Sequence, residues 1–306
     1  MTKTLLGSLG PQIIDMTNRA IDPLILVALL GFGVLLTATP PAPAFPTVDP
    51  SERWRTAVNV GWIGYDEDRE PQICSGGSGG LLGEVNLVVT NEHVSAYDAE
   101  YLEGCEDPYL AVGYSFDAKD DRFVWFPATE RFSNYSLDIA VLDVQLQVEP
   151  WFEGGPEDIA PLRAGDWPVL KLADLDPQIG DPIGAYGFPS IGGYTVTFTS
   201  GHVAGWVEDY AQSRSVMMKV DLNITHGSSG SLVLNQDGDV VGLVALLGIP
   251  MGQEEDSVDC TILADTNLDG EIDDDDTCVS VGGFINSAVS LEQLRKFLSQ
   301  KQVIEE

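Results

Sequence analysis

Short apolar runs, bounded by glycine, proline or charged residues, recur along most of the chain and are rich in β-branched side chains. Runs of about four to eight residues with this composition favour strands over helices. In the first half we expect strands at Ala57–Gly64, Glu84–Thr90, Tyr109–Tyr114, Arg122–Phe126 and Ile139–Val144. In the second half we expect them at Pro182–Gly187, Tyr194–Thr199, His202–Val207, Val216–Val220, Ser231–Leu234 and Val240–Leu246. The pattern predicts an all-β architecture.

Three local signals add connections to these strands. Residues 151–166 are acidic, rich in glycine and proline and without periodicity, which is typical of a connection between two groups of strands. The pair Asp237-Gly238 predicts a hairpin turn between the last two runs. Near the C-terminus, apolar residues at positions 291, 294, 297 and 298 form one stripe of a short helix, with Ser290 as the expected N-cap.

The N-terminal region is different in character. Residues 23–38 form an uncharged apolar run, shorter than the roughly 20 residues that span a bilayer comfortably. The run is typical of a signal-peptide core, and Ala42 and Ala44 offer a cleavage site, so residues 1–44 are either a signal peptide or an uncleaved signal anchor. The prolines that follow predict an extended linker at residues 45–56. Both interpretations predict export to the periplasm, the extracellular medium or the outer face of the cytoplasmic membrane.

The balance of charged residues limits the classes of partner that the protein can bind. The 306 residues include 15 Lys and Arg against 48 Asp and Glu, a formal net charge of −33 at pH 7. Such a charge repels phosphate backbones and anionic lipid, so we expect no nucleic-acid partner. Membrane contact is expected only through the N-terminal apolar segment, if that segment is uncleaved. A solvated acidic surface is one explanation of the charge and the steering of a substrate is another.

The chain has four cysteines, and an even number in an exported protein favours disulfides. Cys74 and Cys105 lie on either side of His93, whereas Cys260 and Cys278 lie on either side of an acidic loop. We favour these two local pairings among the three that four cysteines allow. Two or more free buried thiols are the alternative.

A glycine-rich string, residues 225–232, carries the candidate nucleophile Ser229. A serine hydroxyl needs a base to take its proton and donors to hold an oxyanion. Gly227 allows the backbone to turn so that two N–H groups point at one place, and Gly230 lets the chain leave the turn without a clash. Alone the string is a weak signal, because small residues at a tight turn would also explain it.

Few residues are candidates for the base that would activate Ser229 and for the acid that would orient this base. Of the three histidines, His202 lies inside a strand-like run and His226 is too near Ser229 along the chain to face it easily. His93, which follows a strand-like run, is therefore the favoured base. Asp138 lies at the start of an apolar run, where a buried acid would need a partner.

Three motifs together carry a family resemblance: Thr90-Asn-Glu-His-Val94, Leu137-Asp-Ile-Ala-Val-Leu142 and Gly227-Ser-Ser-Gly-Ser231. In this order they resemble the triad motifs of trypsin-like (chymotrypsin-fold) serine proteases. The segments Gly180–Pro189 and Thr199-Ser-Gly201 are similar to the bacterial high-temperature-requirement and glutamyl-endopeptidase branches. Ser231 and Leu232 depart from the commoner Gly-Pro, and no Arg-Ile-Val-Gly-Gly activation site is present.

The resemblance implies two six-stranded antiparallel β-barrels with a short C-terminal α-helix, in a protease domain at residues 57–300. Barrel one would span about residues 57–150 and barrel two about 167–288, followed by a tail at 301–306. We expect no peptide-binding domain after Leu298.

The resemblance also implies site residues and substrates. Ser229 would be the nucleophile, His93 the base and Asp138 the orienting acid, with the N–H groups of Gly227 and Ser229 as the oxyanion hole. Substrates would be proteins or peptides, and catalysis would need no cofactor. The expected substrate-binding residues carry no charge, so we expect cleavage after uncharged, small to medium apolar residues. They are Asn223, Ala245, Leu246 and Leu247.

The acidic loop at residues 260–278 contains the ligand pattern of an EF-hand-type calcium loop. Gly270 supplies the sharp turn, and Asp276 stands at the twelfth position, where glutamate is usual. The expected ligands are Asp265, Asn267, Asp269, Glu271, Asp273 and Asp276. A structural Ca²⁺ is one interpretation, and a solvated acidic hairpin is the other.

Two functions compete with a protease. One is a catalytically inactive relative that binds peptides, and the other is a calcium-dependent surface protein in which the barrels are incidental. Labelling of Ser229 by a fluorophosphonate would separate the inactive relative from an active enzyme. The surface protein instead predicts partner binding that survives Ser229→Ala.

Overall fold

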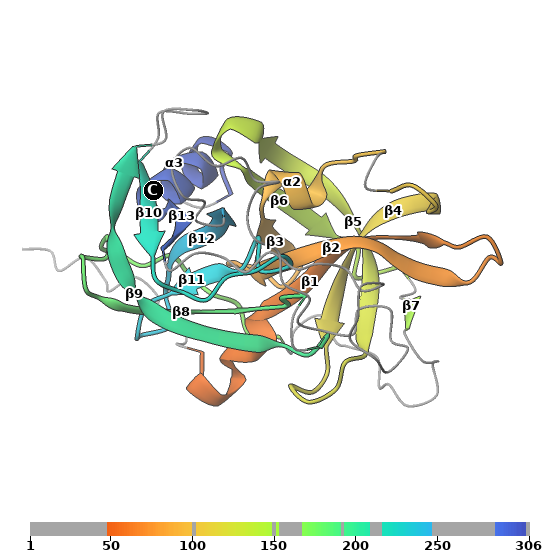
Figure 1. The fold of residues 1–306 in the computed structure, drawn as a ribbon, viewed down its shortest axis with the longest axis horizontal. Coiled ribbons are helices and arrows are strands. Elements are labelled where there is room, and N and C mark those ends of the chain that lie inside the picture. Colours follow the sequence, from red (N-terminus) through yellow and green to blue (C-terminus); the bar gives the residue numbers. More distant parts are fainter. Residues whose placement is uncertain are drawn as a thin grey trace, which may run out of the picture. The chain divides into compact units, whose positions relative to one another are not determined.

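Two closed barrels of antiparallel strands form most of the described part of the chain (Figure 1). The computed structural model describes residues 48–99, 102–148, 151–152, 167–190, 193–208, 216–246 and 285–303. All of these residues belong to one unit, Phe45–Glu306. The expectations for residues 1–44 lie outside the described residues. The prediction of two six-stranded antiparallel barrels with a short C-terminal helix is confirmed.

Barrel one follows the order β4-β1-β2-β3-β6-β5 and is closed by pairing of β4 with β5. Its strands are β1 (Ala57–Tyr65), β2 (Pro71–Leu81), β3 (Leu87–Thr90), β4 (Glu106–Ser115), β5 (Phe123–Asn134) and β6 (Ile139–Val144). A short strand, β7 (Trp151–Phe152), is added to β5. The interior is filled by apolar side chains that alternate along the strands, such as Val58 and Val60 of β1 and Ala140 and Leu142 of β6.

Barrel two follows the order β10-β13-β12-β11-β8-β9 and is closed by pairing of β9 with β10. Its strands are β8 (Pro182–Gly187), β9 (Thr197–Glu208), β10 (Val216–Val220), β11 (Leu232–Leu234), β12 (Val240–Leu246) and β13 (Asn286–Ser290). The last strand leads directly into helix α3 (Leu291–Gln300).

Helix α3 has the cap and the stripe that the sequence predicts. The Ser290 hydroxyl accepts a hydrogen bond from the backbone N–H of Gln293 at 3.4 Å. The residues at positions 291, 294, 297 and 298 are buried, whereas Glu292 and Lys296 are exposed. Burial of one apolar stripe against barrel two stabilises a helix that would be marginal in isolation.

Several strand boundaries differ from the predictions. Strands β2 and β13 were not expected, and residues 84–86 precede β3 rather than belong to it. The runs expected at 194–199 and 202–207 form one strand, β9, which begins only at Thr197. Up to His202 this strand pairs with β8, and from Val203 onward it pairs with β10. A single long strand that changes partner closes the barrel, and Gly201 within it is not a break.

The predicted linker is also different. Residues 50–56 form a 3-10 helix, η1, rather than an extended chain. Asp49 caps it by accepting from the backbone N–H of Ser51 at 2.9 Å. Arg53 donates to the carbonyls of Gln236 (3.2 Å) and Asp237 (2.7 Å) in the predicted turn between β11 and β12. These bonds attach η1 to barrel two, and a free linker could not provide them.

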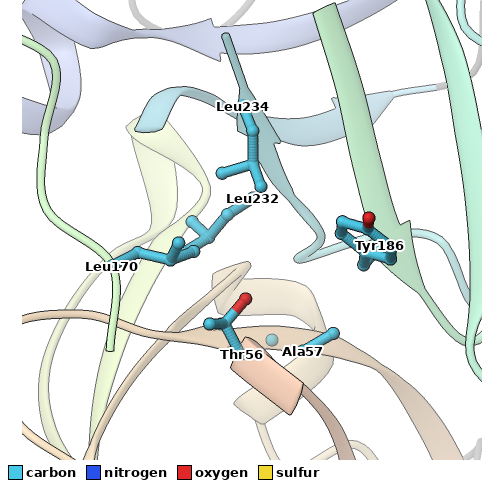
Figure 2. A pocket seen from close by; sticks show the side chains of 8 residues that line it. Thr56, Ala57, Leu170, Tyr186, Leu232 and Leu234 are labelled. Atoms are coloured by element: carbon cyan, nitrogen blue, oxygen red, sulfur yellow. The ribbon is translucent and has the colours of Figure 1, made fainter. Parts of the chain in front are cut away.

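The two barrels pack closely. A β-carbon on Gly80 of β2 would overlap the Leu232 side chain of β11, so glycine permits this approach. A cavity of about 10 Å³ lies at this contact. Figure 2 shows side chains that line it, such as Leu170, Tyr186 and Leu232. It is lined by Thr56, Ala57, Gly79, Gly80, Leu170, Tyr186, Leu232 and Leu234. A space of this size admits at most one water molecule, so it is part of the packing and cannot receive a peptide.

Candidate active site

The ends of two paired strands bring His93 and Asp138 together. Thr90, the last residue of β3, pairs with Ala140 near the start of β6. A single helical turn, α2 (Glu92–Ser95), follows β3 and carries His93. The imidazole Nδ1 lies 2.9 Å from both carboxylate oxygens of Asp138. The His93 side chain is 48% exposed and the Asp138 side chain 16%, so the acid lies behind the base.

The Asp138 backbone is in an uncommon conformation that its surroundings stabilise. Asp138 follows a short 3-10 helix, η2 (Tyr135–Leu137), with φ 51° and ψ 50°. The Asn91 side chain donates to the Asp138 carbonyl at 2.8 Å. The backbone N–H of His93 donates to Asp138 Oδ1 at 3.1 Å. An ionised carboxylate can only accept, so a neutral imidazole in this contact would carry its proton on Nδ1 and present the Nε2 lone pair.

A second carboxyl group lies beside this pair. Burial raises the pKa of Glu92, and repulsion from Asp138 and Glu130 raises it further. Glu130 in turn accepts from the hydroxyl of Ser95, one turn along from Glu92. Neither Glu92 nor Glu130 was predicted as a site residue from the sequence. Only the position of Glu92 immediately before His93 could have drawn attention to it.

Ser229 lies in a tight turn between β10 and β11. The Ser228 N–H donates to the Thr225 carbonyl and the Ser231 N–H to the Ser228 carbonyl, both at 3.0 Å. Gly227 (φ 82°) and Gly230 (φ 87°) are both left-handed. A β-carbon on Gly230 would overlap the carbonyl oxygen of Ser78 in barrel one. Glycine is therefore required there by both backbone angle and space.

Backbone contacts attach the Ser229 turn to the element that carries His93. The Ser78 N–H of β2 donates to the Ser229 carbonyl at 2.8 Å. The Ser78 carbonyl accepts from the Thr90 hydroxyl at 2.7 Å, three residues before His93. A β-carbon on Gly77 would lie 2.9 Å from the Val94 side chain and 3.1 Å from the Ser229 carbonyl. Thus the Ser229 carbonyl and the side chain of Val94, the neighbour of His93, both lie close to Gly77 of β2.

The expected substrate-binding residues are partly described. Asn223 is exposed, and its N–H donates to the Thr199 hydroxyl at 3.2 Å. Ala245 is buried on β12, and Leu246 is the last residue of that strand. Leu247 lies outside the described residues. The Val244 carbonyl accepts from the Gly230 N–H at 3.1 Å, so β12 runs beside the Ser229 turn.

The other two histidines are not part of this arrangement. His202 is exposed on β9, where its backbone N–H and its Nδ1 both contact the carboxylate of Asp221, the latter at 3.4 Å. His226 is exposed, and its carbonyl accepts from Ser190.

Two of the four cysteines lie within the described residues, whereas the other two and the expected calcium ligands do not. A disulfide joins Cys74 of β2 to Cys105 immediately before β4, the first of the two expected pairings. Cys260, Cys278 and the six expected calcium ligands at 265–276 lie outside the described residues. Within the described ranges no group of three His, Cys, Asp or Glu side chains is arranged to hold a metal ion.

Comparison with known proteins identifies the family of the chain. The family model described as "Trypsin-like peptidase domain" matches residues 77–243, which is more than half of the chain and includes the three sequence motifs around His93, Asp138 and Ser229. The chain belongs to the trypsin-like peptidase family. No catalytic cofactor is required by serine peptidases of this kind, because side chains and backbone N–H groups provide the chemistry.

Relatives of this trypsin-like peptidase include proteins named as serine proteases. It is 26% identical to "Serine protease HTRA2, mitochondrial" of Drosophila pseudoobscura pseudoobscura, over 57% of this chain and 34% of the relative. It is 25% identical to "Serine protease HTR4" of Rattus norvegicus, over 56% of this chain and 30% of the relative. It is 26% identical to "Putative serine protease HhoA" of Synechocystis sp., over 57% and 38%.

The chain thus matches about a third of the length of these curated relatives. Among the described residues of this trypsin-like peptidase, no helix is both long and apolar enough to cross a membrane.

Proposed function

We propose that this chain is an exported serine endopeptidase in which Ser229 is the nucleophile, His93 the general base and Asp138 the orienting acid. The contact of His93 Nδ1 with both oxygens of Asp138 is the observation that carries the proposal. The family match supports peptide-bond hydrolysis, and the short backbone path from Ser229 through Ser78 to Thr90 supports the choice of serine.

In the proposed reaction the Ser229 hydroxyl attacks the substrate carbonyl while Nε2 of His93 takes its proton. Asp138 keeps the imidazole in the productive tautomer and stabilises the imidazolium that forms. His93 then returns the proton to the leaving amine, and an acyl-enzyme forms on Ser229. Water attacks that ester with the same base, and the free serine is regenerated.

We assign the oxyanion hole to the backbone N–H groups of Gly227 and Ser229. The left-handed φ of Gly227 supports this, since it allows the backbone to direct N–H groups two residues apart toward one point. Two preorganised donors contribute several kcal/mol to the stability of a tetrahedral intermediate, because losing one costs about 2.7–4 kcal/mol in a comparable site.

We also propose cleavage after uncharged, small to medium apolar residues. The absence of charge at Asn223, Ala245, Leu246 and Leu247 supports this preference. Digestion of a peptide library by the purified protein tests it, and a strong preference for Arg, Lys or Glu would contradict it.

Export is the second part of the proposal. The disulfide between Cys74 and Cys105 supports folding in an oxidising compartment, and residues 1–44 carry the signal-peptide pattern. Cell fractionation with the full chain tests this, because recovery only from the cytosol with reduced thiols would contradict export.

A structural Ca²⁺ at residues 265–276 is the third part, and the sequence pattern of the loop alone supports it. The ion would stabilise the fold and would take no part in peptide hydrolysis.

The decisive experiment compares wild type with Ser229→Ala. We expect wild type to hydrolyse casein and to be labelled covalently on Ser229 by a fluorophosphonate. Ser229→Ala should lose both properties while melting at about the same temperature. Casein hydrolysis by well-purified Ser229→Ala would contradict the assignment. Peptide binding by a wild type that is neither active nor labelled would favour the inactive relative.

A further inference from the structure

Two serine side chains outside the triad hold the peptide groups on either side of Gly227. We propose that Ser78 and Ser190 are positioning residues that fix the Gly227 N–H in the direction of the oxyanion. This inference rests on the proposed function, because it concerns the oxyanion hole assigned above.

Ser190 acts on the peptide group before Gly227. Its backbone N–H donates to the His226 carbonyl at 2.8 Å, and its hydroxyl donates to the same oxygen at 3.0 Å. The His226 carbonyl and the Gly227 N–H belong to one planar trans peptide and point in opposite directions. Two donors on that carbonyl therefore set where the Gly227 N–H points.

Ser78 acts on the peptide group after Gly227. Its hydroxyl donates to the Gly227 carbonyl at 2.6 Å and accepts from the Phe188 N–H at 2.8 Å. The Ser78 side chain is 0% exposed, so water cannot replace either bond. The hydroxyl thus links β2 of barrel one to two loops of barrel two.

The loop at residues 188–190 completes the enclosure of Gly227. A β-carbon on Gly227 would overlap the Phe188 carbonyl and would lie 3.0 Å from the Ser190 nitrogen. Rotation of either peptide group about Gly227 is opposed by this packing and by the hydrogen bonds on both carbonyls. A glycine with φ 82° has no side chain of its own to limit such rotation, so the neighbours supply the restraint.

The test compares Ser78→Ala and Ser190→Ala with wild type. The substrate is a peptide anilide chosen from the wild-type cleavage profile, and the inhibitor is the aldehyde of the same peptide, whose hemiacetal oxygen occupies the oxyanion hole. We expect kcat to fall roughly tenfold in each variant, as loss of about one hydrogen bond in the transition state predicts. KM should change less than twofold, and aldehyde binding should weaken by the same factor as kcat.

Matched controls separate positioning from a general loss of stability. Ser115 is a buried serine whose hydroxyl donates to the Asp117 carbonyl, and Ser51 is an exposed serine whose hydroxyl donates to Asp49. Ser115→Ala and Ser51→Ala should keep wild-type kcat and aldehyde affinity even where the melting temperature falls. Ser190→Thr retains both donors and should restore kcat to near the wild-type value.

The outcomes are distinguishable. If Ser78→Ala does not fold, Ser190→Ala alone decides, because Ser190 is exposed. Unchanged kcat and aldehyde affinity in a folded Ser190→Ala would overturn the inference while leaving the protease assignment intact. A higher KM at constant kcat would overturn it too. A wild type without hydrolysis or Ser229 labelling would refute the proposed function and this inference with it.

Discussion

His93 directs its Nδ1 toward both carboxylate oxygens of Asp138, each at 2.9 Å, and Asp138 holds this position in a left-handed backbone conformation. Asparagine tolerates that conformation at least as well as aspartate does. Asp138→Asn should therefore fold normally but stabilise the wrong imidazole tautomer. We expect kcat to fall by about 10⁴, measured with a peptide anilide under saturating conditions.

The second His-Asp pair in the molecule provides the control. His202 of β9 contacts Asp221, which follows β10, at 3.4 Å, but the two side chains are 58% and 40% exposed. His202→Ala and Asp221→Asn should keep kcat within a few-fold of wild type. A collapse of kcat in His202→Ala, with activity retained in His93→Ala, would transfer the role of base to His202.

Gly230 and Gly83 are both left-handed, with φ of 87° and 74°, but only Gly230 is enclosed. A β-carbon on Gly230 would overlap backbone of β2, whereas one on Gly83 has no atom within 4 Å. Gly83→Ala should cost about 1 kcal/mol from backbone conformation alone and should remain active. Gly230→Ala should separate the Ser229 turn from barrel one and abolish hydrolysis. Denaturant unfolding and fluorophosphonate labelling distinguish the two effects, and a fully active Gly230→Ala would show that the turn tolerates displacement.

The disulfide between Cys74 and Cys105 closes a loop of 31 residues that contains His93. Replacing both cysteines by alanine should lower the free energy of unfolding by about 3–4 kcal/mol, mainly because the unfolded chain gains freedom. The measurement is urea unfolding of the double variant and wild type under oxidising conditions. Because the side chains of His93 and Asp138 hydrogen-bond to each other and not to a cysteine, kcat of the folded double variant at low temperature should match that of wild type.

The sequence could predict the strands that are determined by a local pattern of apolar side chains. It could not predict the strands that are determined by close backbone packing. Strands β6, β8, β10 and β12 have the predicted bounds because their apolar runs end at turn residues or charges. Strand β2 has no such pattern, because its second half consists largely of glycine and serine. These small residues permit the close approach to barrel two. The role proposed for Ser78 could not be predicted either. It depends on two loops, far apart along the chain, that both hydrogen-bond to the Ser78 hydroxyl.

The triad candidates were predictable because their motifs are local, but their surroundings were not. The raised pKa of Glu92 comes from burial and from carboxylates 38 and 46 residues away along the chain, at Glu130 and Asp138. Likewise, the attachment of η1 to the β11–β12 turn depends on Arg53 reaching carbonyls 183 and 184 residues away. Contacts of this kind have no signature in a short stretch of sequence.

Calcium should stabilise the protein through the acidic loop without a role in hydrolysis. The carboxylates of residues 265–276 repel each other until a divalent cation neutralises them. Calcium at one hundred times Kd should add about 2.7 kcal/mol to the free energy of unfolding. Melting curves with calcium or chelator, for wild type and for Asp265→Ala combined with Asp269→Ala, provide the measurement. Equal calcium-induced shifts in both proteins would exclude this loop, and no shift in either would favour a solvated hairpin.

Glu92 should make stability fall as the pH rises through its titration. Its pKa is raised above the ordinary 4.5 by burial, then by repulsion from Asp138 and Glu130. The folded state therefore binds more protons than the unfolded state between the two pKa values, so the free energy of unfolding decreases with pH across that window. The contribution of the protonated Glu92 to stability is complete below the pKa of Glu92 in the unfolded chain and is lost above its pKa in the folded protein.

Glu92→Gln, which cannot ionise, should melt at a higher temperature than wild type at about pH 7, with the difference vanishing near about pH 3.5. Glu292→Gln is the matched control, since Glu292 also lies in the first turn of a helix but is exposed. It should change the melting temperature little at either pH. A Glu92→Gln variant that melts below wild type at about pH 7 would show that the ionised carboxylate stabilises α2 more than burial and its two acidic neighbours destabilise it.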